Sequence, residues 1–316
     1  MMNTFRQRLI GAVLCLAALS LAGGVVPGMI GDTLPVSALA RILDSLAPQF
    51  LLAGLLLSIV AGVLGAWRIG LVTGLVVAGF AGWFMLGHLQ RSLPLQRDAQ
   101  VAVRVLFFNT LITNEANAGR IAKAVEDSGA DVVALAESEA MRKALPELRR
   151  TYPNMLGCDR ACNVVILSKL PFSGEPSGRV PAQWDGRLRE AQVELGDGRV
   201  LTLAALQALK PWTLEPAIRT TEQVQDLLHD IAGPVLVAGD FNAAPWGRMN
   251  RALLDESGLR AARVPVPTWP VGSGWAGVPI DNMFVRGGAR LVSLKPFGAG
   301  LGSNHLGLLA EVALGG

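Results

Sequence analysis

Six polar residues are of the types that bind metal ions or move protons, and each closes or follows an apolar run of the chain. They are two amides, three carboxylates and an imidazole: Asn109, Glu137, Asp240, Asn242, Asp281 and His305. Mg²⁺ prefers hard oxygen ligands and is usually held by one or two carboxylates together with substrate phosphate. Phosphoryl transfer depends mainly on positioning and charge stabilisation, which a metal, an amide and an imidazole supply. The set therefore predicts metal-assisted chemistry on a phosphoester.

The elements that must position these residues are the apolar runs before them, which are typical of β-strands. A sheet delivers the side chains at its strand ends to one rim, so residues distant in the sequence can meet there. A single Gly-Asp-x-Asn after a strand is usually only a turn, but five polar blocks in order between residues 104 and 307 favour a shared site. We expect helices at 116–128, 141–150 and 216–231, and strands at 103–108, 131–135, 164–167, 192–195, 200–206, 235–238, 268–270, 280–285 and 306–312.

The five blocks resemble the motifs of the endonuclease/exonuclease/phosphatase superfamily, which includes DNase I-like nucleases, abasic-site endonucleases and neutral sphingomyelinases. The resemblance extends over about residues 101–316 and is closest to bacterial membrane-anchored members. It implies an α/β fold, a four-layer α/β sandwich of two packed, mostly antiparallel sheets flanked by helices. It also implies a hydrolase of phosphodiester bonds, such as an endonuclease or exonuclease, that depends on Mg²⁺ or Mn²⁺. The blocks are Arg104–Asn109, Val133–Glu137, Gly239–Asn242, Pro279–Asn282 and Gly302–His305.

The resemblance also implies a metal site. Glu137 would be the principal metal ligand, and Asn109 would help to hold the metal and the phosphate. Asn304 stands where the family typically has the aspartate of a Ser-Asp-His block. Its carbonyl oxygen could still bind the metal, but the negative charge of an aspartate is lost there.

The same resemblance implies catalytic roles for four further residues. Asp240 would orient or deprotonate the attacking water, and Asn242 would donate hydrogen bonds to the phosphoryl oxygens as charge builds on them. His305 would contact the scissile phosphate, while Asp281 would fix the tautomer of its imidazole. These residue types suit a reaction that needs a base, a donor and a positioned imidazole.

Substrate contacts are expected from residues near the same rim. Gln207 stands where many members have a histidine, and it cannot act as a general acid near neutral pH. Arg187 and Trp246 are candidates for binding the anionic and the apolar parts of a substrate. Lys210 also follows a strand near this rim, and exposed charge is the default for a lysine. We therefore interpret Lys210 as solvated surface.

Composition separates two parts of the chain. The mean hydropathy of +0.41 is high for a soluble enzyme, and the apolar excess is concentrated in the first 90 residues. The first 89 residues hold four arginines against two aspartates, which leaves +1 of the total charge of +3 for the remainder. A near-neutral catalytic region argues against strong non-specific binding to duplex nucleic acid. We predict a membrane region at 1–90, a linker at 91–102 and a catalytic domain at 103–316.

Three apolar stretches, at about 9–30, 49–67 and 69–88, are long enough to cross a hydrocarbon core of about 30 Å. The alternatives are a buried helical hairpin and a cleaved secretory signal, but the cleavage-like Ala38–Ala40 lies far beyond the apolar core. The basic residues flanking the stretches are balanced, so charge bias does not decide the orientation. Three crossings from an inside start predict an inner-membrane, multi-pass protein bound to the lipid bilayer through residues 1–90. The catalytic domain would then be periplasmic.

Cys158 and Cys162 are four residues apart, in a loop before a predicted strand. A disulfide would be natural in an oxidising compartment. Free thiols and half of a zinc site are the other interpretations.

Two classes of function remain open. The first is a membrane-anchored, metal-dependent phosphodiesterase whose substrate is nucleic acid or a phospholipid headgroup. The second is a catalytically weakened binding or scaffold domain that retains the fold, an interpretation favoured by Asn304 and Gln207. No protein partner can be inferred.

Overall fold

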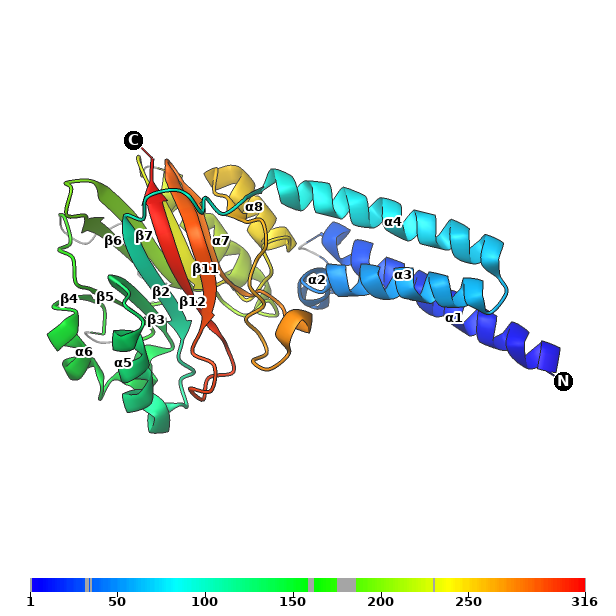
Figure 1. Cartoon of the computed structure of the whole chain (residues 1–316), viewed down its shortest axis with the longest axis horizontal. Helices are drawn as coiled ribbons and strands as arrows, with labels where there is room; N and C mark the ends of the chain where they lie inside the picture. Colours follow the sequence, from blue (N-terminus) through cyan, green and yellow to red (C-terminus); the bar gives the residue numbers. More distant parts are fainter. Residues whose placement is uncertain are drawn as a thin grey trace. The chain divides into compact units, whose positions relative to one another are not determined.

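A computed structural model of the chain describes residues 2–31, 34, 36–158, 162–174, 186–229 and 231–315. They form two compact units (Figure 1). The first comprises Met1–Gln90, Pro211–Leu214 and Trp246–Arg248. The second comprises Arg91–Lys210, Glu215–Pro245 and Met249–Gly316. The first unit is helical and the second carries the sheets.

Two elements of the first unit are long and apolar enough to cross a membrane, among the residues that the structure describes. They are the segment Asn3–Met29, which contains α1 (Met2–Val25), and α4 (Trp67–Gln90). The intervening α3 (Ala47–Val63) qualifies only together with α2 (Ser37–Asp44), from which it is bent by 70°. The first unit therefore offers two candidate spans, or three if the bent pair is one.

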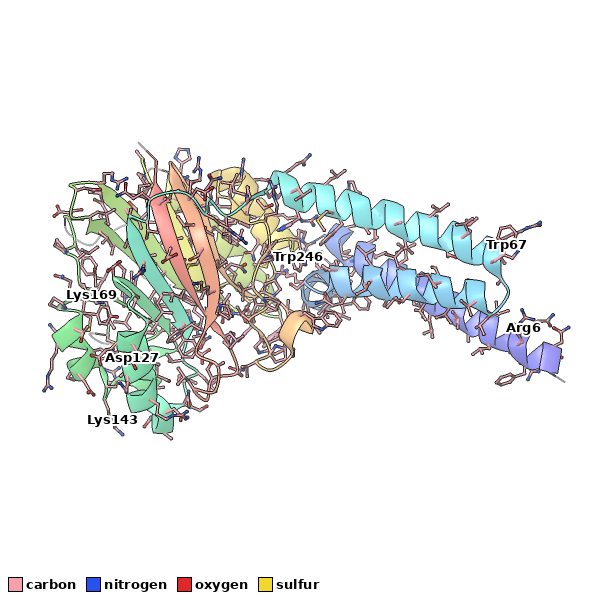
Figure 2. The ribbon with its side chains drawn as sticks, in the orientation of Figure 1. Arg6, Trp67, Asp127, Lys143, Lys169 and Trp246 are labelled. Atoms are coloured by element: carbon pink, nitrogen blue, oxygen red, sulfur yellow. A yellow bond between two sulfur atoms is a disulfide. The ribbon has the colours of Figure 1, made fainter. Side chains whose placement is uncertain are left out.

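Contacts at both ends of α3 show that it runs antiparallel to α1. Near the end of α1, a Cβ atom on Gly24 would lie 2.9 Å from Cγ of Leu51, so a larger residue there would force Leu51 to shift. At the other end, Arg6 donates a hydrogen bond to the carbonyl of Leu64, just after α3. Figure 2 shows Arg6 and Trp67 at the same end of the helices. α3 thus returns the chain to the end where α1 began, and α4 starts from there.

Two sheets form the centre of the second unit. In the six-stranded sheet the order is β11-β12-β2-β3-β5-β4, and in the four-stranded sheet it is β10-β8-β7-β6. Within them only the pairs β2–β3 and β7–β8 are parallel, so both sheets are mostly antiparallel. The strands are β2 (Val103–Asn109), β3 (Val132–Ala136), β4 (Asn154–Leu156), β5 (Val164–Ser168), β6 (Leu188–Glu194), β7 (Val200–Gln207), β8 (Val235–Asp240), β10 (Asp281–Arg286), β11 (Ala289–Phe297) and β12 (Gly307–Leu314).

Three apolar clusters hold the layers together. The largest lies between the sheets, where Phe107 of β2 and Ile166 of β5 meet Leu203 of β7 and Met283 of β10. A second fixes α5 (Ala118–Asp127) and α6 (Leu145–Thr151) to the outer face of the six-stranded sheet. A third fixes α7 (Leu214–His229) and α8 (Arg248–Ser257) to the four-stranded sheet. The four-layer α/β sandwich is therefore confirmed.

Local differences from the expected elements have simple causes. Residues 138–141 form a 3₁₀ helix, and α6 begins only at Leu145. Pro146 then lies in the first helical turn, where its missing N–H is not needed. The segment 268–270 is not a strand, and only an isolated bridge joins Trp269 to Val278. Ser92–Leu93 forms a short strand, β1, that pairs with β9 (Ala261–Ala262).

Cys158 and Cys162 form a disulfide, which is one of the three alternatives that the sequence left open. Ser138, the residue after Glu137, donates through its hydroxyl to the carbonyl of Cys162 at 3.0 Å. The disulfide is therefore close in space to the end of β3.

Candidate active site

Strand ends of both sheets bring the predicted polar residues to one edge. β2 and β3 are parallel neighbours, so Asn109 and Glu137 close adjacent strands. In the other sheet, β8 lies between β7 and β10, and Asp240 is opposite both Gln207 and Asp281. The convergence expected from the apolar runs is thus present in the register of the strands.

Asn109 connects the two sheets. Its Nδ2 lies 3.3 Å from Oε1 of Glu137 and 3.1 Å from Oδ2 of Asp240, and its side-chain oxygen accepts from the N–H of Leu111 at 3.0 Å. Glu137 also accepts from the N–H of Ile112 through Oε2 at 2.8 Å. The backbone of Glu137 is left-handed, with φ of 51°. Such conformations are strained in non-glycine residues and cluster at functional sites.

Gln207 links Glu137 to Arg187. Its Nε2 donates to Oε1 of Glu137 at 2.6 Å, and its Oε1 accepts from Arg187 at 2.8 Å. Only this orientation of the amide gives the carboxylate a donor and the guanidinium an acceptor. Arg187 is therefore held beside the site through a neutral bridge, without forming an ion pair with Glu137 in this arrangement.

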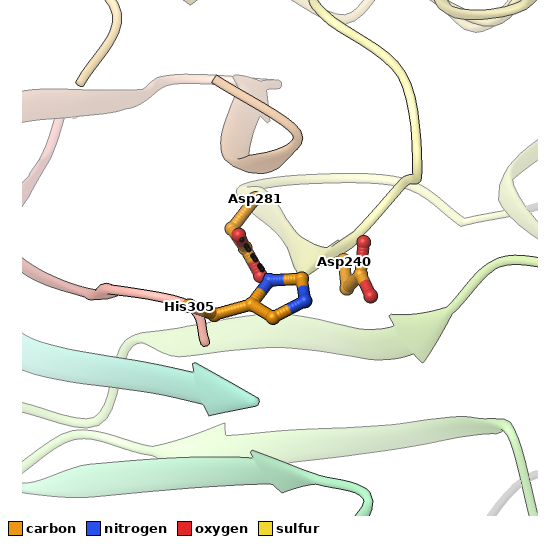
Figure 3. A group of neighbouring side chains, drawn as sticks. All are labelled: Asp240, Asp281 and His305. Atoms are coloured by element: carbon orange, nitrogen blue, oxygen red, sulfur yellow. Dashed lines mark hydrogen bonds and ion pairs between the residues drawn. The ribbon is translucent and has the colours of Figure 1, made fainter. Parts of the chain in front are cut away.

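Asp240, Asp281 and His305 form a buried cluster in which the imidazole lies between the two carboxylates (Figure 3). Nδ1 of His305 is 2.9 Å from Oδ2 of Asp281. Candidate ligand atoms of the three residues lie within 4.8 Å of one another. Ser303 fixes the loop that carries the histidine, because its hydroxyl donates to the carbonyl of Asn109 at 2.7 Å and accepts from the N–H of His305 at 3.1 Å.

The cluster shifts the pKa of two of its members. Burial raises the pKa of Asp240 to about 6, and the charge of Asp281 adds to this, against lowering by His305, Lys210 and the Asn242 N–H. For His305, burial lowers the pKa, but the charge and hydrogen bond of Asp281 and the charge of Asp240 outweigh it, so the pKa rises to about 8. Without a metal, His305 is therefore mainly protonated near neutral pH.

Asn242 occupies the turn after Asp240 and has a left-handed backbone, with φ of 50°. Its N–H donates to Oδ1 of Asp240 at 2.9 Å, and its Nδ2 donates to the carbonyl of Ala208 at 2.8 Å. Its side-chain oxygen accepts from Nζ of Lys210 at 3.0 Å. The turn therefore connects the carboxylate of Asp240 to a cationic side chain.

The model of the endonuclease/exonuclease/phosphatase family matches residues 105–305. The chain belongs to this family. The matched region contains the whole four-stranded sheet and, apart from β12 and the first residues of β2, the six-stranded sheet, and it ends at His305. No curated protein matches the sequence.

Solved structures with a similar fold include an endonuclease/exonuclease/phosphatase, a sphingomyelinase and a protein solved with a DNA product. One is an endonuclease/exonuclease/phosphatase from Beutenbergia cavernae, with 18% identity and a TM-score of 0.53 over 69% of this chain and 72% of that one. Sphingomyelinase C from Streptomyces griseocarneus has 17% identity and a TM-score of 0.50 over 67% and 99%. D. rerio TDP2 complexed with a single-strand DNA product has 18% identity and a TM-score of 0.52 over 66% and 98%. At these identities the likeness shows the fold alone.

The side chains at this edge fit a divalent metal, as expected for the endonuclease/exonuclease/phosphatase family. Oδ1 of Asp281 is buried and has no hydrogen-bond partner among the described residues. An unpartnered buried carboxylate oxygen calls for a cation or water. Glu137, Asp240 and Asp281 supply hard oxygens of the kind that Mg²⁺ and Mn²⁺ bind.

Two of the residues singled out in the sequence make the contacts that the structure describes for them outside this hydrogen-bonded group. The side chain of Asn304 is exposed, and its backbone carbonyl accepts from the N–H of Val271 at 3.0 Å. Trp246 belongs to the first unit, where its indole donates to the carbonyl of Ser45 at 3.1 Å and its ring packs edge-on against Phe84 and His88. Their roles toward metal and substrate stay predictions.

Lys210 differs from its interpretation as solvated surface, because its side chain is half-buried and bonded to Asn242. In the sequence, only its position three residues after the end of β7 indicated that Lys210 could lie near the site. The hydrogen bond from Ile112 to Glu137 could not be predicted from residue types, because its donor is a backbone N–H and not a side chain. Both contacts depend on loop conformations that follow the strands.

A pH-dependent stability follows from the raised pKa of His305. A group whose pKa is higher in the folded state stabilises the fold at low pH, and this contribution disappears as pH rises through the folded value. For a shift from 6.5 to about 8, metal-free protein should lose about 2 kcal/mol of stability in all as pH rises from well below 6.5 to well above 8, with the steepest loss between these two values. Chemical unfolding of the detergent-solubilised chain in EDTA measures this loss. His305→Gln should lack this step, and an equal loss in that variant would contradict the assignment.

Proposed function

We propose that this chain is a membrane-anchored, divalent-metal-dependent phosphodiesterase. The observation that carries the proposal is the hydrogen-bonded group in which Asn109 joins Glu137 to Asp240, beside the Asp281–His305 pair. This group places the half-exposed carboxylate of Glu137 next to the buried cluster of Asp240, Asp281 and His305. Such a pairing suits a reaction that needs both a cation and proton transfer.

Each residue then has a role in hydrolysis. Glu137 would hold the metal, Mg²⁺ or Mn²⁺, whose charge polarises the phosphoryl group. Asp240 would accept a proton from the attacking water, which its raised pKa favours over an ordinary aspartate. His305, kept protonated by Asp281, would contact the phosphoryl oxygens. Asn242 would donate to the same oxygens.

Nucleic acid and phospholipid headgroups are the two substrate classes that we propose to test. The sphingomyelinase with a similar fold is named for a lipid, and the TDP2 structure is named with a single-strand DNA product. The candidate membrane helices and the near-neutral charge of the remainder favour a lipid, because binding duplex nucleic acid usually needs a basic face.

The deciding experiment is an assay of the purified full-length protein in detergent. Bis-p-nitrophenyl phosphate tests the reaction class, while single-stranded DNA and sphingomyelin or phosphatidylcholine vesicles test the substrate. Hydrolysis that needs Mg²⁺ or Mn²⁺ and stops in EDTA supports the proposal. Inertness toward all of these substrates, by a protein that still unfolds cooperatively, would favour the weakened scaffold domain instead.

We also propose that the chain is a multi-pass inner-membrane protein with the catalytic unit in the periplasm. The supporting observation is that α1 and α4 start at the same end of the helical unit. If both cross the membrane in the same direction, α3 must return, which makes the number of crossings odd. The disulfide between Cys158 and Cys162 also suits an oxidising compartment.

Reporter fusions after Gln90 should therefore give active alkaline phosphatase and a non-fluorescent green fluorescent protein. In a Cys15→Ser background, which removes the free thiol of α1, the chain should resist alkylation until it is reduced. The matched control is Cys15→Ser with Cys158→Ser, in which Cys162 should react without reduction after denaturation. A fluorescent fusion together with freely reactive thiols would reverse the orientation.

A further inference from the structure

Lys210 is a cationic side chain at the candidate site for which the sequence predicted no role. Its half-buried side chain follows β7, three residues after Gln207. Nζ of Lys210 lies 3.0 Å from Oδ1 of Asn242. Asn242 is in turn bonded through its N–H to the carboxylate of Asp240 at 2.9 Å. One amide residue thus separates the ammonium from the proposed catalytic base.

The amide of Asn242 is held so that its oxygen faces Lys210. Its Nδ2 donates to the carbonyl of Ala208 at 2.8 Å, and a carbonyl cannot donate in return. An ammonium has three donors and no acceptor, so it requires the oxygen end of the amide. The reverse orientation would oppose donor to donor at Lys210 and acceptor to acceptor at Ala208. The side chain of Asn242 is therefore fixed by two contacts of opposite kind.

Holding a lysine through a neutral amide has an electrostatic consequence. A lysine side chain loses rotamer entropy when it is fixed in one position. An aspartate at position 242 could also fix it, but its charge would offset that of the ammonium. The asparagine contact positions the cation and itself adds no negative charge beside it. Burial is the largest influence on the pKa of Asp240 and of His305, and the Lys210 charge is a further influence that lowers both.

We infer that Lys210 is a substrate-contacting residue that binds a non-bridging oxygen of the phosphoryl group, and that Asn242 positions it. The inference rests on the proposed function and deepens it. Hydrolysis adds the hydroxyl of water to phosphorus and its other hydrogen to the leaving oxygen, and the bond from phosphorus to that oxygen breaks. Lys210 takes no part in this proton transfer. Its positive charge stabilises the negative charge that builds on the phosphoryl oxygens in the transition state.

Two readouts test Lys210, and only one of them depends on turnover. The first is kcat/KM, measured with Mg²⁺, for bis-p-nitrophenyl phosphate. This substrate has no nucleobase or lipid chain whose binding could mask a phosphate contact. The second is the affinity for inorganic phosphate, measured by calorimetric titration at low salt in EDTA. Lys210→Met should lose about a hundredfold in kcat/KM, comparable with removal of one transition-state donor. Its phosphate affinity should fall about tenfold, as expected for the loss of one charged contact.

Matched variants separate charge from structure. Lys210→Arg keeps the charge and should retain most of both quantities, whereas Lys210→Gln keeps a donor for Asn242 and should resemble Lys210→Met. Lys123→Met is the control, because Lys123 is an exposed lysine of α5 that pairs with Asp127 at 3.1 Å. It should equal wild type in both readouts. If Lys210→Met unfolds more easily than wild type, Lys210→Gln takes its place.

The outcomes distinguish this inference from the proposed function. Equal phosphate affinities of wild type and Lys210→Met, or no phosphate binding by either protein, would overturn the inference. A wild-type protein that hydrolyses nothing, but binds phosphate more tightly than Lys210→Met, would remove the proposed function and leave Lys210 as an anion-binding residue. A loss in Lys210→Arg as large as that in Lys210→Met would also overturn the inference, because the charge would then not be the property that matters.

Discussion

Glu137→Gln should reduce metal-dependent phosphodiester hydrolysis by about a hundredfold or more, because a neutral amide replaces the proposed principal metal ligand. Oε1 of Glu137 accepts from both Asn109 and Gln207, and a glutamine oxygen can keep these two bonds. Its amide nitrogen would instead face the N–H of Ile112, which now donates to Oε2. We expect this mismatch to destabilise the fold by only about 1–3 kcal/mol.

Calorimetric titration with Mg²⁺ should show weaker metal binding by Glu137→Gln, and initial rates should show the loss of turnover at saturating substrate. Glu115→Gln is the matched control, since Glu115 is an exposed glutamate that pairs with Lys143. It should be indistinguishable from wild type. Near-normal turnover of Glu137→Gln would falsify the assignment of Glu137 as metal ligand.

The strand ends were predictable from the sequence because most of the central strands are buried on both faces. β3 and β5 are buried at every position and therefore appear as uninterrupted apolar runs. β11 was not predicted, and the reason is visible in its residues. Arg290, Lys295 and Pro296 interrupt its apolar pattern, and it is an edge strand whose second side has no partner in its sheet. Edge strands tolerate charge and proline for that reason.

The site was predictable in its residue types but less so in its connections. Strand ends brought Asn109, Glu137 and Asp240 together, as the apolar runs predicted. The contact between Gln207 and Glu137 joins the two sheets, and no local pattern in a sequence specifies how two sheets face each other. The position of Lys210 depends on a loop after β7, where backbone conformation rather than hydrophobic periodicity decides where the side chain lies.

Asp281→Asn should lower kcat by about a hundredfold to ten-thousandfold, as expected when a buried carboxylate that orients a catalytic imidazole becomes an amide. Nδ1 of His305 lies 2.9 Å from Oδ2 of Asp281, and both side chains are buried. An amide at 281 can present its NH₂ to Nδ1 and so favour the other tautomer of the ring. It also removes the charge that keeps His305 protonated. Binding of bis-p-nitrophenyl phosphate should change less than kcat.

The pH dependence of activity distinguishes a role of Asp281 in orienting and charging His305 from a merely structural role. Burial lowers the pKa of His305, and Asp281 is the main group that raises it again to about 8. If the protonated imidazole contacts the phosphoryl group, wild-type activity should decline as pH rises through that value. Without the Asp281 charge, the pKa of His305 falls, so the decline in Asp281→Asn should begin at lower pH. Asp127→Asn removes an exposed surface carboxylate from α5 and should leave the profile unchanged.

An alkaline limb at the same pH in wild type and Asp281→Asn would separate His305 from the reaction. Asp240 governs the acidic limb instead, since burial raises its pKa first and the charge of Asp281 raises it further, to about 6. The two residues act on opposite sides of the profile. Asp240 must lose its proton to accept one from water, whereas His305 must keep its proton to contact the phosphoryl oxygens. A profile in which His305→Gln abolishes the alkaline limb and keeps the acidic limb, shifted to higher pH because the His305 charge no longer lowers the pKa of Asp240, would therefore assign the base to Asp240 and the charged contact to His305.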